Sequence, residues 1–90
     1  MNTSRTRPSS DALRAWLVTY LARLIGVPES EIDPAAPFDV HGLDSSGAVG
    51  LSGDLEDLLG AEFETSLVYD HPSIDALVRH LVSLELVEAA

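Results

Sequence analysis

Apolar residues at helical spacing constrain the fold of this chain more than any other feature of its sequence. In the first third of the chain they recur every three or four residues, which places them on one face of an α-helix. These residues are Leu13, Trp16, Leu17, Tyr20, Leu21, Leu24 and Ile25. We expect the two aromatic side chains among them to pack into the core. Ser9 or Ser10 can cap this helix, and Gly26 and Pro28 are expected to end it.

Two further segments show the same periodicity. One is expected to start at Asp44 or Ser45 and to stop near Gly60, with apolar positions at Val49, Leu51, Leu55, Leu58 and Leu59. The other follows a capping residue at Ser73, with apolar positions at Ile74, Leu77, Val78, Leu81 and Leu84. A short helix capped by Thr65 lies between them, and no segment alternates like a strand. The predicted fold class is an all-α four-helix bundle, with three longer helices and one short one.

A long loop over residues 27–42 separates the first two helices. It contains three prolines, which exclude a continuous helix. Ile32 and Phe38 are expected to anchor the loop on the core. Loops of this length are uncommon in small domains unless they serve a function.

The chain has 90 residues, which is the length of one domain. We predict a disordered tail over residues 1–8, the folded domain over residues 9–86 and a C-terminal tail over residues 87–90. There is no cysteine, so a disulfide framework and a thiolate metal site are both excluded. No apolar run approaches the ~20 residues that span a bilayer, and no signal peptide is evident. We therefore expect a cytoplasmic protein that does not enter a membrane.

The charge of the chain is strongly acidic. Fifteen acidic residues face five basic ones, and the twelve acids between Arg23 and Arg79 are interrupted by no base. Such a surface repels nucleic acid, whose phosphates require Lys and Arg. It attracts basic partner surfaces at long range, although an acidic face also serves solubility alone.

The residue with the greatest functional interest is Ser45, where the loop that contains Gly42 turns into the second helix. A hydrolase is not indicated, because the nucleophile elbow requires Gly two residues before the serine and this chain has Leu43 there. A metal site is not indicated either, since the three histidines show no i, i+4 pair. The residues alone leave two readings, a serine that another enzyme modifies or a simple helix-capping residue, and they favour the second.

Three glycines, Gly47, Gly50 and Gly53, repeat at intervals of three within the second helix. Each costs roughly 0.5–1 kcal/mol relative to alanine. Two explanations remain open: something approaches this side of the helix closely, or the helix is simply weak there.

Three motifs give the chain a resemblance to acyl carrier proteins of the polyketide synthase type, from Leu13 to Leu84. Gly42-Leu43-Asp44-Ser45 resembles the family's attachment motif for 4'-phosphopantetheine. Asp70-His71-Pro72-Ser73 resembles the link between its third and fourth helices. Ile32-Asp33-Pro34 followed by Pro37-Phe38 resembles its first loop. The three motifs occur in the family's order and at its spacing.

The resemblance implies that Ser45 carries a covalent 4'-phosphopantetheine arm, with Asp44 as its motif neighbour, and that the arm holds acyl groups as thioesters. A phosphopantetheinyl transferase using magnesium and coenzyme A would install the arm. An acyltransferase or fatty acyl-AMP ligase would load it, and a ketosynthase or another synthase enzyme would unload it. The carrier itself would be a non-catalytic monomer that acts in polyketide or fatty-acid-derived biosynthesis. We predict that partners contact Asp54, Glu56, Asp57, Gly47 and Gly50.

The chain departs from the family pattern at two points. Ser46 follows the attachment serine where a large apolar residue is usual, and the second helix carries no arginine. Residues 48–60 are more similar to carriers loaded by fatty acyl-AMP ligases, including the loading region of the mycobacterial mycolic-acid condensing synthase. Two alternatives remain: a peptidyl carrier protein, and an acidic helical docking module without a prosthetic group.

Overall fold

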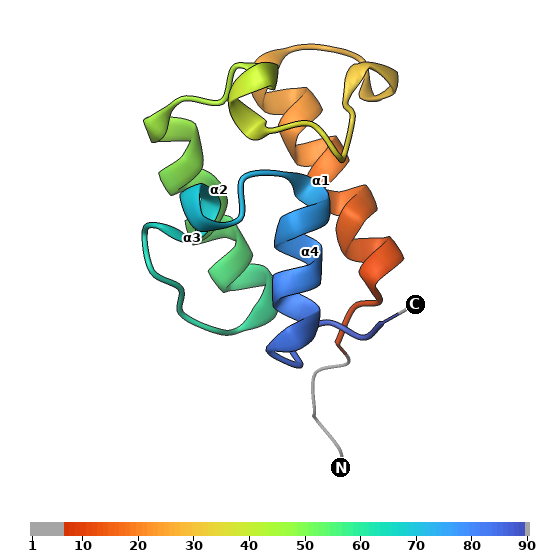
Figure 1. The fold of residues 1–90 in the computed structure, drawn as a ribbon, viewed down its shortest axis with the longest axis vertical. Coiled ribbons are helices and arrows are strands. Elements are labelled where there is room, and N and C mark those ends of the chain that lie inside the picture. The colour runs from red at the N-terminus through yellow and green to blue at the C-terminus, as the bar shows by residue number, and fades with distance from the viewer. Residues whose placement is uncertain (1–6, 90) are drawn as a thin grey trace.

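The computed structural model describes residues 7–89, and within this range it contains four α-helices and no strand. These are α1 (Ser10–Ile25), α2 (Ser45–Leu59), α3 (Leu67–Asp70) and α4 (Ile74–Ser83). Two short 3-10 helices, η1 (Glu29–Glu31) and η2 (Phe38–His41), lie in the first loop. The predicted fold class, three longer helices with one short helix, is confirmed (Figure 1). No helix in the described range has both the length and the apolar character needed to cross a bilayer.

Local capping chemistry fixes the ends of the longer helices, as predicted. The Ser9 hydroxyl accepts a hydrogen bond from Ala12 N, and Gly26 ends α1 in the left-handed conformation. Ser73 caps α4 in the same way, through a bond from Ala76 N. The predicted cap at Thr65 is wrong, because α3 begins two residues later. Ser66 precedes that helix, and its hydroxyl bonds to Asp70 instead of capping.

The core is formed by the apolar faces of all four helices and by the two predicted loop anchors, Ile32 and Phe38, which are both buried. The helical residues at its centre are Leu13, Leu17, Leu21, Leu51, Leu55, Ile74, Leu77 and Leu81. An ion pair at 2.9 Å between Arg14 and Asp75 joins α1 to α4 across the edge of this core. Figure 1 shows α4 beside α1, with α2 on the other side of α4 in that view.

The first loop is attached to the link between α3 and α4. Phe38 N donates to Pro72 O at 2.7 Å, and Asp75 N donates to Pro34 O at 3.0 Å. These two bonds connect segments that lie more than 30 residues apart in the sequence. The loop is thereby held in place at the end of the bundle where α2 begins (Figure 1).

The two ends of the described chain lie against each other. Glu88 N donates to Pro8 O at 2.9 Å, Ser10 N donates to Glu88 O at 2.7 Å, and Val87 is buried in the core. The contacts of Pro8, Val87 and Glu88 therefore lie just beyond the predicted boundaries at residues 9 and 86. Residues 1–6 of the predicted N-terminal tail lie outside the described residues.

Candidate functional site

A tight turn delivers the chain to the first residue of α2. Gly42 has a φ of +92°, a conformation that glycine adopts without steric cost. The turn is closed by two backbone bonds, from Gly42 N to Asp39 O and from Leu43 N to Phe38 O. Since Phe38 is a core anchor, the turn has a fixed position relative to the bundle.

Asp44 is the N-cap of α2, as predicted. Its carboxylate oxygen Oδ1 accepts a hydrogen bond from Gly47 N at 2.8 Å, and its carbonyl accepts the first helical bond from Ala48 N. A cap of this kind is worth about 1 kcal/mol. Ser45 is consequently the first helical residue and is not itself the cap.

The Ser45 side chain is exposed, and its hydroxyl makes no hydrogen bond within residues 7–89. Within residues 7–89 no histidine or carboxylate is hydrogen-bonded to it, as the base beside an activated nucleophile would be. The free backbone N–H groups of the first helical turn favour negative charge beside it. An exposed, unengaged hydroxyl at a helix N-terminus suits a phosphodiester, and this fits the group that the motif implies.

Two hollows flank the turn that carries Ser45, and Leu43 lines both. One lies between α1 and α2, has a volume of about 350 Å³, and is lined in part by Asp44, Ser46 and Gly47. The other has a volume of about 370 Å³ and lies between the first loop and α3, with Phe38 and Tyr69 in its lining.

The glycines of α2 differ in their surroundings. A Cβ atom at Gly47 would lie 2.6 Å from Leu43 Cδ1 and 3.1 Å from Leu24 Cδ2, so these leucines occupy the space of its missing side chain. A Cβ atom at Gly50 would lie 3.6 Å from the Tyr20 hydroxyl, which is an ordinary contact, and one at Gly53 would meet nothing. The close approach that the glycine spacing suggested therefore comes, at Gly47, from the chain's own side chains.

Gly50→Ala is expected to raise the free energy of unfolding by about 0.5–1 kcal/mol, because alanine restricts the unfolded chain and fits the helix. Gly47→Ala is expected to raise the free energy of unfolding less, or to lower it, since its methyl group must displace Leu43. Urea unfolding of the two variants measures the difference. An equal increase in the free energy of unfolding at both positions would contradict the expectation that Leu43 crowds a side chain at Gly47.

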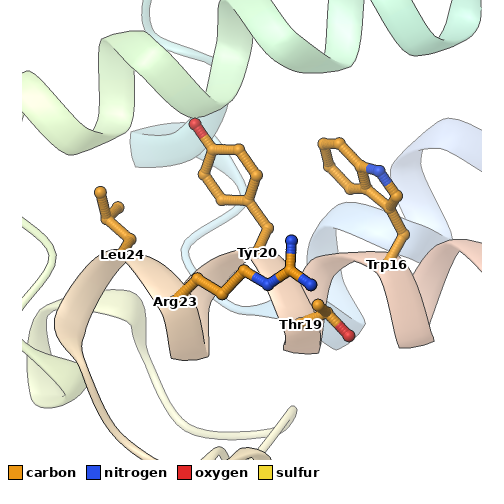
Figure 2. Close-up of a pocket in the computed structure, with 5 residues that line it drawn as sticks. All are labelled: Trp16, Thr19, Tyr20, Arg23 and Leu24. Carbon is orange, nitrogen blue, oxygen red and sulfur yellow. The ribbon is translucent and has the colours of Figure 1, made fainter.

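Trp16 and Tyr20 are half-buried and pack against the core, as expected. Their rings stack with centroids 5.2 Å apart, and Figure 2 shows both reaching from α1 toward α2, beside Leu24. Burial raises the pKa of Tyr20 to about 12, and a hydrogen bond to Asp54 and the charge of that carboxylate add to the increase. Tyr20 therefore stays protonated at neutral pH, and its hydroxyl lies against α2 beside Gly50.

The acidic residues predicted for partner contact have unequal roles. Glu56 accepts a hydrogen bond from Phe63 N at 2.8 Å and so holds the chain that leaves α2. Asp54 lies near Tyr20, and its charge contributes to the raised pKa of that residue. Asp57 is exposed and makes no side-chain bond within residues 7–89. Of the three carboxylates, Asp57 is the one that the fold leaves free.

Two of the three histidines meet, although nothing in the sequence spacing indicates it. The rings of His71 and His80 stack with centroids 3.8 Å apart. Burial lowers the pKa of His80, and the charge of His71 lowers it further. Within residues 7–89 no cluster of three histidines or acids has metal-binding geometry.

Comparison with known proteins decides what this arrangement is. The sequence family described as the phosphopantetheine attachment site matches residues 15–81, which include the turn, Ser45, the whole of α2 and α3, and most of α1 and α4. The chain belongs to this family. Its members carry 4'-phosphopantetheine covalently on a serine.

Named relatives identify this family member as an acyl carrier protein. The acyl carrier protein TtuC of Teredinibacter turnerae is 33% identical over 75 residues, which cover 83% of this chain and 86% of TtuC. A phenolphthiocerol/phthiocerol polyketide synthase of Mycobacterium tuberculosis is 40% identical over 73 residues. That match covers 81% of this chain but only 4% of the synthase polypeptide.

Solved carrier proteins have the same fold. The acyl carrier protein LipD of Actinoplanes friuliensis has a TM-score of 0.73 at 40% identity, covering 96% of this chain and 94% of LipD. A free-standing peptidyl carrier protein of Acinetobacter baumannii has a TM-score of 0.80 at 40% identity, and the match covers 86% of this chain and 96% of that protein. Since the curated relatives named above are polyketide or acyl carriers, the peptidyl alternative is not favoured for this acyl carrier protein.

Proposed function

We propose that Ser45 is the residue of this acyl carrier protein that bears the 4'-phosphopantetheine arm. The main support is the position of Ser45. It is the first residue of α2, and its exposed hydroxyl makes no hydrogen bond within the described residues. Asp44 caps the helix beneath it, and Gly42 and Phe38 fix the turn before it. The helix start supports the negative charge of a phosphodiester.

The attachment would need a separate transferase. The Ser45 oxygen would attack the phosphorus of coenzyme A that bears the pantetheine, forming a phosphodiester. Adenosine 3',5'-bisphosphate would leave, and the hydroxyl proton would pass to a base of the transferase. The arm supplies a terminal thiol that holds acyl groups as thioesters, and the chain's residues contribute exposure, orientation and the favourable helix terminus.

The partners and pathway follow from this assignment. We infer that an acyltransferase or fatty acyl-AMP ligase loads the arm, and that a ketosynthase or another synthase enzyme receives the acyl group, as part of polyketide or fatty-acid-derived biosynthesis in the cytoplasm. The chain would act as a monomeric substrate of these enzymes and catalyse nothing itself. The family match at residues 15–81 supports a carrier domain over residues 9–86, and the contacts of Pro8, Val87 and Glu88 add the adjoining residues to it.

Intact-mass spectrometry tests the proposal. The purified chain is incubated with coenzyme A, magnesium and a transferase of broad specificity, with a reaction lacking transferase as control. We expect a single mass increase of one phosphopantetheine group in the complete reaction only. An unchanged mass would support the acidic docking module without a prosthetic group.

The free carboxylate of Asp57 provides a test of partner recognition. Asp57→Lys is expected to slow loading of the arm several-fold at low ionic strength and much less at high salt, because surface charge acts mainly on the encounter rate. Glu31→Lys, in the first loop, makes the same change in net charge and serves as the matched control. If both variants slowed loading equally, the loading rate would depend on net charge alone, and the partner enzyme would not recognise Asp57 on α2.

A further inference from the structure

The residue two positions before Ser45 packs over the first turn of α2. Leu43 is half-buried, and its Cδ1 atom lies 2.6 Å from the point that a Cβ atom of Gly47 would occupy. The Leu43 N–H donates to Phe38 O, which holds its backbone in place. Leu24 Cδ2, from α1, lies 3.1 Å from the same point. Leucines of the turn and of α1 therefore fill the space of the side chain that Gly47 lacks.

This packing is a variant of the hydrophobic staple. In that motif an apolar residue just before the N-cap contacts the fourth helical residue and fixes the angle at which the chain enters the helix. Asp44 is the N-cap of α2, so Leu43 is at the staple position and Gly47 is the third helical residue. Here the contact is made one residue earlier than usual, over a position that has no side chain.

A side chain at residue 47 would disturb both devices that start α2. It would collide with Leu43, and its Cβ atom would lie 3.3 Å from Asp44 Oδ1, the oxygen that caps the helix. A capping box commonly has Glu or Gln at this third position, reaching back to the N-cap backbone. The chain has Gly47 instead, and this choice leaves room for Leu43 to lie against α2.

Ser45 lies between these contacts. On one side of it the backbone is fixed by Leu43 and Asp44, and on the other by Gly47 N, which donates to Asp44 Oδ1 at 2.8 Å. Its own hydroxyl makes no hydrogen bond within residues 7–89. The place of the Ser45 oxygen relative to the bundle therefore depends on the entry angle of the chain into α2.

Transfer of the arm requires accurate placement of this oxygen. The attacking oxygen and the leaving oxygen lie roughly in line through the phosphorus. Misplacing a reacting atom by about 1 Å can cost about 100-fold in rate. A residue that changes the entry angle can thus act on the reaction without touching the transferase or coenzyme A.

We propose, on the basis that Ser45 bears the arm, that Leu43 and Gly47 are positioning residues for its attachment. The Leu43 side chain lies over Gly47, sets the angle at which the turn enters α2, and thereby presents the Ser45 oxygen to the transferase. This role accounts for a glycine at a helical position where it costs stability.

The other two glycines of α2 do not share this role. A Cβ atom at Gly50 would make an ordinary contact with the Tyr20 hydroxyl, and one at Gly53 would meet nothing. Gly53→Ala makes the same exchange on the same helix without displacing a neighbour. It is therefore the matched control for Gly47→Ala.

Steady-state kinetics of arm transfer to the full chain test the proposal. Initial rates are measured by intact mass over a range of carrier concentrations, with coenzyme A, magnesium and a transferase of broad specificity. Gly47→Ala is expected to lower kcat about tenfold with little change in KM, because a carrier with a misplaced oxygen still docks. Gly53→Ala is expected to keep the parental kcat and KM. Melting curves give a temperature at which every variant is folded.

Leu43→Ala and the variant with both substitutions complete a double-mutant cycle. Leu43→Ala introduces no clash, and we expect it to lower kcat several-fold because the turn is no longer held against α2. Adding Gly47→Ala to Leu43→Ala is expected to cause little further loss, since the side chain that the methyl group displaces is no longer there.

A second measurement does not depend on the arm. Nuclear Overhauser contacts between the Leu43 methyl groups and Gly47 Hα are expected in the unmodified chain, and their absence would refute the packing itself. If the unsubstituted chain showed these contacts but gained no mass with the transferase, the attachment at Ser45 would be refuted and the packing would not.

The kinetic outcomes distinguish positioning from direct recognition. If Gly47→Ala raised KM and left kcat unchanged, the transferase would contact residue 47 itself, as predicted for partners from the sequence, and the positioning role would be wrong. An equal loss of kcat on Gly47→Ala with and without Leu43→Ala would show that Leu43 is not involved. If Gly47→Ala does not fold, a Leu43→Ala chain modified with the parental kcat would likewise overturn the proposal.

Discussion

Ser45→Ala is expected to take up no phosphopantetheine, whereas Ser46→Ala is expected to be modified like the unsubstituted chain. The serine oxygen is the atom that would form the phosphodiester, so its removal eliminates the reaction instead of slowing it. Ser46 carries the same hydroxyl on the next residue. Side chains of neighbouring helical residues point about 100° apart, so a transferase that reaches one oxygen does not reach the other.

Neither substitution should disturb the fold. Asp44 supplies the cap of α2 through its bond to Gly47 N, and both serines are exposed. The free energy of unfolding should therefore change by about 0.5 kcal/mol or less. Intact mass after incubation with coenzyme A and a transferase is the measurement, and a melting curve is its control. Modification of a folded Ser45→Ala chain would show that the arm is attached elsewhere.

The parts of the fold that depend on local sequence were predictable. Helix boundaries follow from apolar spacing and from caps, and the structure places them at Ser9, Gly26, Ser73 and Gly60 as expected. The exception is α3, where Thr65 and Ser66 are equally suitable capping residues. In a helix of four residues, contacts with the rest of the fold decide the boundary, and a local pattern does not contain them.

Contacts between distant segments were not predictable in the same way. The glycine spacing indicated a low side of α2 but not that Leu24 and Leu43 cover Gly47, because the sequence does not give the rotation of α2 relative to α1. The acidic pattern likewise gave no sign that Glu56 binds Phe63 N. Such bonds depend on which side chain the folded chain brings within about 3 Å.

A second large effect is expected at Phe38, the residue that fixes the first loop. Its side chain is buried, its N–H donates to Pro72 O, and its carbonyl accepts from Leu43 N just before the attachment site. Truncation of a buried phenylalanine typically costs about 3–5 kcal/mol. Small domains have only about 5–15 kcal/mol of stability in total. Phe38→Ala is therefore expected to lose most of the stability of this chain.

Thermal unfolding measures this effect. For a domain of this size, 1 kcal/mol shifts the melting temperature by roughly 4–8 °C, so Phe38→Ala should melt more than about 10 °C below the parent. Phe38→Leu should recover much of the loss, since leucine fills part of the same space. Tyr69→Ala is the control, because Tyr69 lines the same hollow but is 62% exposed.

The variants at Phe38 also connect stability with the attachment reaction. The turn over residues 39–44 reaches Ser45 from a residue held in the core, so loosening Phe38 should make the turn mobile before the bundle unfolds. At a temperature where Phe38→Leu remains folded, we expect it to accept the arm more slowly than Tyr69→Ala. If Phe38→Ala melts within about 2 °C of the parent, a loss of well under 1 kcal/mol, the loop is held chiefly by its backbone bonds to Pro72 and Asp75. The side chain of Phe38 would then not determine where Ser45 lies.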